Sequence, residues 1–111
     1  MAIALDFELR LSRQDDTRPD VRIWVDADGN QQMDHGEEIR PLRQDGLVFR
    51  GSRSLALPTV EGVGFLVRLQ VRPGTRFRLR VWSHDGKSRA LVYEEQDAAP
   101  DGSHRIIGWC R

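Results

Sequence analysis

The sequence predicts an all-β protein, a single antiparallel sandwich of two sheets and about seven strands. Apolar and polar residues alternate with a period of two in several short segments, which is typical of strands with one buried face. Asp-Gly pairs separate some of these segments, and this pair favours tight turns because both residues tolerate positive φ. No window shows the 3.6-residue periodicity of a helix. The 111 residues have the size of one domain, so we expect residues 1–111 to fold as one unit.

The predicted strands follow one another along the whole chain. In order they cover residues 5–11, 21–25, 47–49, 65–71, 77–82, 90–93 and 106–109. Leu55 and Leu57 either extend the third strand or form a separate one. The best turn signal is Asp85-Gly86, which predicts a two-residue hairpin turn between the strands that contain Val81 and Val92. Further Asp-Gly pairs stand at 28–29, 45–46 and 101–102.

Charge and cysteine content exclude several classes of protein. The chain has 17 basic and 17 acidic residues, so its total charge does not indicate binding to a polyanion or a membrane surface. Residues 1–45 carry six arginines and 11 acidic residues, whereas residues 46–84 carry seven arginines and one glutamate. The two regions either offset each other or the second forms a basic surface for an acidic partner. The lone cysteine, Cys110, excludes an internal disulfide and a cysteine-based zinc site.

Motifs of common enzymes are absent from the sequence. It has no G-x-S-x-G elbow, no G-x-x-x-x-G-K loop and no G-x-G-x-x-G motif. The three histidines are scattered over expected loops or loop edges, at His35, His84 and His104. No apolar stretch approaches the length of a membrane span. We therefore expect a noncatalytic protein without a membrane span.

The segment from Asp26 to Glu37 carries the one pattern with a defined chemistry. Oxygen-bearing side chains fall at its first, third, fifth, seventh, ninth and twelfth positions, namely Asp26, Asp28, Asn30, Gln32, Asp34 and Glu37. Calcium takes about six to eight oxygen ligands, and a tightly wound loop turns alternate residues toward one ion. In this arrangement Gln32 contributes its backbone carbonyl and Glu37 two carboxylate oxygens. The alternative is an acidic, solvated hairpin loop without an ion, because Asp, Asn and Gly favour turns for their own reasons.

This pattern resembles the calcium loops of EF-hand and dockerin proteins. The matching residues are Asp26, Asp28, Gly29, Asn30, Asp34 and Glu37. The chain departs from that pattern at Gln31, where the family has glycine, and strand-like flanks replace the helices. The segment is more similar to calcium loops between strands in the B-type repeats of bacterial surface adhesins, on Trp24, Asp26, Asp28, Gly29, Gly36 and Glu37. The resemblance implies a noncatalytic sandwich stabilised by calcium, and Gln31 suggests weak affinity, about 10⁻⁵ to 10⁻³ M.

A second resemblance covers residues 69–88. This segment is similar to the E–F loop and F strand of fibronectin type III domains, on Leu69, Pro73, Gly74, Thr75, Phe77, Arg80, Val81, Gly86 and Ser88. Phe77 stands where the family usually has tyrosine, so the hydroxyl bond of that corner is missing. The resemblance implies an immunoglobulin-like or fibronectin type III-like sandwich.

Tryptophans and arginines predict an alternative function, binding of an anionic ligand without a metal. Trp24 shares a strand face with Arg22, and Trp82 shares one with Arg78 and Arg80. If these faces point outward, they form an Arg/Trp surface for an acidic glycan, an acidic protein or a nucleic acid. Zero net charge argues against the nucleic acid. Alternatively, each indole merely covers arginine stems, or a partner adds a strand at an exposed edge.

The sequence thus predicts an accessory or recognition module with a protein or glycan partner, and we expect a monomer. The first residues lack a cationic start and a long apolar run, so the chain itself carries no secretory signal. Localisation stays open, because a lone cysteine favours the cytoplasm whereas a calcium loop of modest affinity would be filled outside the cell.

Overall fold

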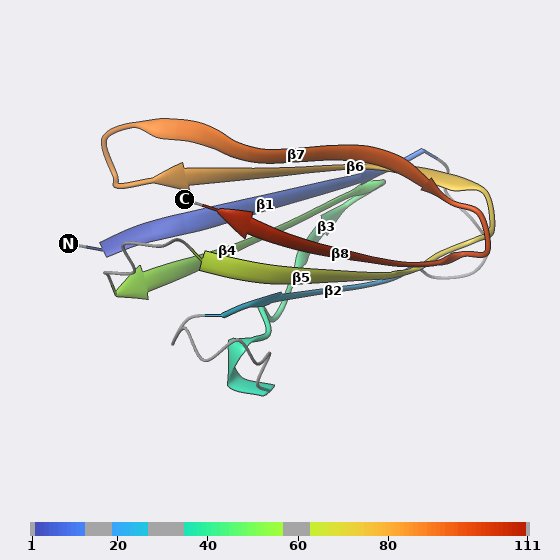
Figure 1. Cartoon of the computed structure of the whole chain (residues 1–111), viewed down its shortest axis with the longest axis horizontal. Coiled ribbons are helices and arrows are strands. Elements are labelled where there is room, and N and C mark those ends of the chain that lie inside the picture. The colour runs from blue at the N-terminus through green and yellow to red at the C-terminus, as the bar shows by residue number, and fades with distance from the viewer. Residues whose placement is uncertain (1, 13–18, 27–34, 57–62, 111) are drawn as a thin grey trace.

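Two antiparallel sheets pack face to face in the computed structural model, which describes residues 2–12, 19–26, 35–56 and 63–110 (Figure 1). The larger sheet has five strands, in the spatial order β3 (Arg43–Asp45), β4 (Val48–Ala56), β1 (Ala2–Leu11), β6 (Thr75–His84) and β7 (Arg89–Ala99). The smaller sheet has three, in the order β2 (Asp20–Val25), β5 (Val63–Gln70) and β8 (Ser103–Cys110). A short 3-10 helix, η1 (His35–Glu37), lies between β2 and β3 in the chain. The predicted all-β, two-sheet antiparallel sandwich is confirmed.

The core lies between the two sheets and includes the residues that the predicted strands assigned to the buried face. These are Leu5, Phe7, Leu9, Leu11, Ile23, Val25, Phe65, Val67, Leu69, Phe77, Leu79, Val81 and Ile106, all of them buried. Phe65 joins the layers, because its ring packs edge to face with the rings of Phe7 and Tyr93, at centroid distances of 5.4 and 5.0 Å. Side chains of a strand alternate between its two faces, so every other residue of the same strands points to solvent.

The turns agree with the Asp-Gly signals only in part. Gly46 has φ 60° and joins β3 to β4 as a hairpin. Asp85-Gly86 joins β6 to β7, but through four residues instead of the predicted two, since the strands end at His84 and resume at Arg89. The Asp85 carboxylate closes this turn by accepting the backbone N–H groups of Lys87 and Ser88, at 2.9 and 3.0 Å. The Asp-Gly pair at 101–102 joins strands of different sheets and is therefore no hairpin turn. The pair at 28–29 lies outside the described residues.

Two features of the strands differ from the prediction. The described residues contain eight strands, because the short strand β3 consists of three exposed polar residues and has no apolar alternation to reveal it. β7 runs to Ala99, well beyond the predicted end at Tyr93. A register shift next to Val81 lets both Val92 and Tyr93 pack against the core, which interrupts the period of two. An immunoglobulin constant domain has seven strands, four in one sheet and three in the other. This sandwich has five and three, so its immunoglobulin-like or fibronectin type III-like character stays a prediction.

Candidate functional sites

The ends of the predicted calcium loop are two buried carboxylates. Asp26 follows β2 and Glu37 ends η1, with 5% and 6% of their surfaces exposed. They are two of the three buried polar or charged residues in the described part of the chain, the third being Thr75. The other four predicted ligands lie outside the described residues, namely Asp28, Asn30, Gln32 and Asp34.

Backbone pairing brings these two ends together. Trp24 in β2 forms an isolated antiparallel bridge with Glu38, and the Ile39 N–H donates to the Ile23 carbonyl at 2.8 Å. The chain that leaves β2 therefore returns alongside it, and buried Ile39 anchors the return in the core. On the other side, the Asp26 N–H donates to the Gly64 carbonyl of β5 at 2.9 Å. Asp26 and Glu37 thus stand at the mouth of one closed loop, as the first and last ligands of a calcium loop would.

The chemistry of this donor pair fits calcium. Carboxylates are the hard oxygen ligands that calcium prefers, and their burial excludes competing water. Within the described ranges no group of three His, Cys, Asp or Glu side chains is close enough to hold a metal ion. Of the loop, the described ranges contain only the two ends, so the six-ligand site stays a prediction.

The five residues of the predicted Arg/Trp surface do not form one surface. Arg22 and Trp24 belong to β2 in the three-stranded sheet, whereas β6, which contains Arg78, Arg80 and Trp82, belongs to the five-stranded sheet. Because the inner faces of the sheets pack together, the outer faces point in opposite directions. The expectation of a single surface is therefore wrong. Alternation within a strand predicts which side chains point outward, but it does not predict to which sheet the strand belongs.

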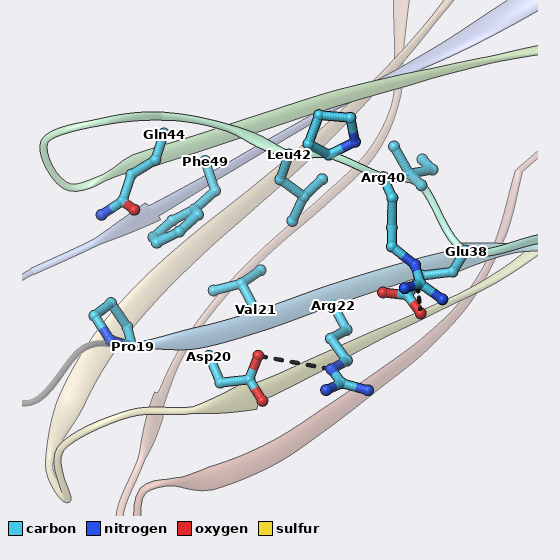
Figure 2. A pocket seen from close by; sticks show the side chains of 11 residues that line it. Pro19, Asp20, Val21, Arg22, Glu38, Arg40, Leu42, Gln44 and Phe49 are labelled. Carbon is cyan, nitrogen blue, oxygen red and sulfur yellow. Dashed lines mark ion pairs between the residues drawn. The ribbon is translucent and has the colours of Figure 1, made fainter. Parts of the chain in front are cut away.

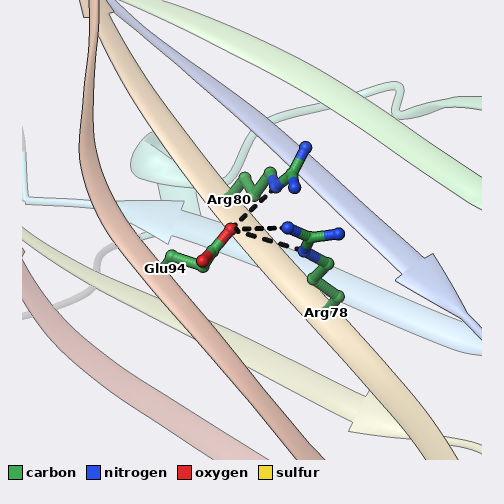
Figure 3. Close-up of polar contacts among 3 residues, drawn as sticks. All are labelled: Arg78, Arg80 and Glu94. Atoms are coloured by element: carbon green, nitrogen blue, oxygen red, sulfur yellow. Dashed lines mark hydrogen bonds and ion pairs between the residues drawn. The ribbon is translucent and has the colours of Figure 1, made fainter.

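One carboxylate already engages two arginines of β6. Arg78 Nη2 and Arg80 Nε approach the same oxygen, Glu94 Oε2, at 3.1 and 2.8 Å (Figure 3). Glu94 lies on β7 directly opposite Arg80. The neighbouring Trp82 is also covered, since the Arg89 guanidinium lies 4.0 Å from the centroid of its ring. On this outer face Arg78 and Arg80 thus share one carboxylate, and Arg89 covers Trp82.

A hydrogen-bonded cluster on the same face centres on Asp6 and was not predicted. Asp6 Oδ1 accepts the Ser52 hydroxyl at 2.7 Å and lies 3.2 Å from His84 Nε2, while Arg89 Nε lies 3.5 Å from Oδ2. Asp6 and Trp82 also line a cavity of about 360 Å³. The Ser52 hydroxyl donates to Asp6, whereas a nucleophilic serine donates its proton to a base such as histidine. Sequence separations of 46 and 78 residues explain why no motif revealed the cluster.

A groove lies where the edge of the small sheet meets the edge of the large one. Its volume is about 340 Å³, and Figure 2 shows apolar side chains of Val21, Leu42 and Phe49 along it. Two ion pairs border it, Asp20 with Arg22 at 3.7 Å and Glu38 with Arg40 at 3.4 Å. Within each pair the negative and positive charges offset each other, so the groove has no marked preference for an anion or a cation.

The outer face of the three-stranded sheet has two rows of side chains that the prediction found only in part. Strand register places Arg22 opposite Arg68, and Arg68 opposite Arg105. In the next outward row, Trp24 is opposite Leu66 and Leu66 is opposite Ile107. Only the β2 members of these rows were predicted. The rows arise from the order of the strands in the sheet, and sequence periodicity does not reveal that order.

No helix in the described part of the chain is long and apolar enough to cross a bilayer.

Comparisons with known proteins assign no family to the chain. No family model matches the sequence, and no curated protein or solved structure matches it significantly. The function must therefore be argued from the geometry of the fold.

Proposed function

We propose that the protein is a noncatalytic recognition module, an immunoglobulin-like or fibronectin type III-like sandwich whose loop 26–37 binds one calcium ion for stability. The observation that supports this most strongly is the burial of Asp26 and Glu37 at the two adjacent ends of the loop. Burying an ionised carboxylate is costly, and a bound cation offsets that cost for both groups at once. Calcium in this position would fasten the connection between β2 and β3 to the sandwich.

The proposed ligands are the six oxygen donors that alternate along the loop. Asp26, Asp28, Asn30 and Asp34 would supply side-chain oxygens, Gln32 its backbone carbonyl, and Glu37 two carboxylate oxygens. Glu37 would contribute most, because it is the bidentate ligand, whereas Asp34 at the ninth position would act through water. The backbone bond of Asp26 to Gly64 of β5 and the position of Glu37 at the end of η1 support these two residues as the first and last ligands.

Thermal unfolding with and without calcium tests the proposal. At a calcium concentration of about 100 times Kd, binding to the folded state alone adds about 2.7 kcal/mol of stability. The wild type should therefore melt at a higher temperature with calcium than with chelator. Glu37→Gln keeps the side-chain volume and should remove most of that increase. Asp45→Asn, an acid-to-amide change at an exposed position of β3, is the matched control and should retain it. Equal calcium shifts in Glu37→Gln and wild type would refute the ligand assignment.

A second candidate is recognition of an anionic partner through the predicted arginine and tryptophan residues. Of the five predicted residues this proposal uses Arg22 and Trp24 on the three-stranded sheet, because Arg78, Arg80 and Trp82 lie on the other sheet. The specific support is the row of arginines on the three-stranded sheet, which extends the β2 half of this set. Binding of this kind should weaken as salt rises, because screening shortens the reach of exposed charges. Affinity that does not change between low and moderate salt would argue against it.

A further inference from the structure

We infer that the outer face of the three-stranded sheet is the docking surface for an acidic protein segment, one that presents carboxylates beside large apolar side chains. The inference rests on the second proposed function, anion recognition, and names both its surface and its partner. It does not depend on the calcium site.

The first support is a row of three like charges directly opposite one another. Arg22, Arg68 and Arg105 occupy paired positions on β2, β5 and β8. Adjacent strands are about 4.8 Å apart, so the three side chains start within about 10 Å of each other. Like charges in directly opposed positions are destabilising. Arg22 has Asp20 at 3.7 Å, and Arg68 and Arg105 make no ion pair with any described residue. Carboxylates from a partner would relieve this repulsion.

The second support is an apolar row beside the arginines, half-buried at Trp24 and Leu66 and exposed at Ile107. Trp24, Leu66 and Ile107 are paired across the sheet, two residues along each strand from the arginine row. Same-face residues on a strand are about 6.6 Å apart, so the two rows lie side by side. Ile107 is 78% exposed, and Trp109, the next residue on this face of β8, is 47% exposed. A partner with apolar side chains about 6.6 Å from its carboxylates would match both rows.

On the opposite face, carboxylates pair with several of the arginines. There Arg50 approaches Glu8 at 3.5 Å, and Glu94 contacts both Arg78 and Arg80. Positive charges of the five-stranded sheet are thus interspersed with carboxylates of the same sheet. Arg68 and Arg105 differ from Arg50, Arg78 and Arg80 in that no described carboxylate of their own sheet is paired with them, so they can engage the carboxylates of a partner.

The composition of the face favours a protein over the other anionic partners. Nucleic acids stack their bases on aromatic rings, but aliphatic Leu66 and Ile107 occupy two of the three positions of the apolar row. Tryptophan and arginine, by contrast, are the residues enriched at the energetic centres of protein interfaces. A second copy of this chain is a poor occupant. Two-fold pairing requires a self-complementary patch, and this face would set arginines against arginines.

NMR titration of the isotope-labelled full chain tests the inference, with three unlabelled probes. The first is a peptide in which glutamate and leucine alternate, the second replaces every glutamate by glutamine, and the third is single-stranded oligothymidine. We expect the acidic peptide to shift amide signals of β2, β5 and β8 at low salt. The glutamine peptide should shift them much less. Arg68→Gln and Ile107→Ser should each weaken binding of the acidic peptide at least about tenfold, as substitutions at an interface centre do.

Arg76→Gln is the matched control, because this exposed arginine lies on β6 in the other sheet. It should bind the acidic peptide like the wild type. No shift at millimolar acidic peptide, or shifts confined to the five-stranded sheet, would overturn the inference. Tighter binding of oligothymidine than of the acidic peptide at β2, β5 and β8 would also overturn it, while leaving the broader proposal of anion recognition intact.

Discussion

Replacing Gly108 by alanine should destabilise the sandwich by about 1–3 kcal/mol, because the new methyl group would collide with the core. Gly108 on β8 lies directly opposite Phe65 on β5, and the Phe65 ring extends over it. A Cβ atom at position 108 would lie 2.5 Å from Phe65 Cε1 and 2.9 Å from Cε2. Phe65 is fully buried and held between the rings of Phe7 and Tyr93, so it has no free space into which to move.

The sign of the change in unfolding free energy distinguishes the collision from the intrinsic preference of alanine over glycine. Alanine is intrinsically more favourable than glycine inside a strand, by about 0.5–1 kcal/mol. Without the collision, Gly108→Ala would therefore be neutral or stabilising. Gly36→Ala is the matched control, since a Cβ at position 36 would have nothing within 4 Å.

Urea unfolding followed by tryptophan fluorescence measures the free energy, and melting curves should show a decrease of about 4 °C per kcal/mol at this chain length. Phe65→Leu should partly rescue the Gly108→Ala variant, so that the double variant loses less than the sum of the single losses. A Gly108→Ala protein as stable as Gly36→Ala, or strictly additive losses, would refute the packing of Phe65 against β8.

Three further predictions concern the turns and the outer face. Gly102→Ala should cost more than about 1 kcal/mol in urea unfolding, because Gly102 has φ 83° and its new Cβ would collide with the Val71 carbonyl; a neutral result would contradict the described crossover. Backbone N–H groups of Ser88 and Lys87 hold the pKa of Asp85 below its usual value of 3.8, so this stabilisation is present above about pH 3.8 and is lost as the pH falls through the lowered pKa. The stability difference between wild type and Asp85→Ala should thus shrink in urea titrations below pH 3.8, and a difference that persists would argue against the turn. Glu94→Gln should cost at most about 1 kcal/mol, since its ion pairs are partly exposed, and a larger loss in the same assay would show that solvent screens them less than expected.

Much of the fold could be predicted because inward and outward positions follow local periodicity. The alternation around Leu9, Val67 and Leu79 identifies buried side chains without any knowledge of their partners. Alternation fails as a guide where the local sequence pattern does not match the environment of the strand. β3 is polar throughout because both its faces are exposed, and the bulge at Val92 places two consecutive side chains against the core.

The candidate sites show the same limit. The calcium pattern could be found in the sequence because its donors are close together along the chain, and the structure adds the burial of Asp26 and Glu37 at its ends. The pairing of Arg22 with Arg68 depends on contact between distant strands, and such contacts leave no signal in local spacing. For that reason the single Arg/Trp surface was wrong, although its residues do point outward.

Calorimetric titration of chelator-treated protein with calcium tests the central proposal most directly. We expect saturable binding of one equivalent, with a Kd of about 10⁻⁵ to 10⁻³ M, and loss of most of the heat in Glu37→Gln. No heat of binding up to millimolar calcium in the folded wild type would contradict it and make loop 26–37 an acidic connection without an ion.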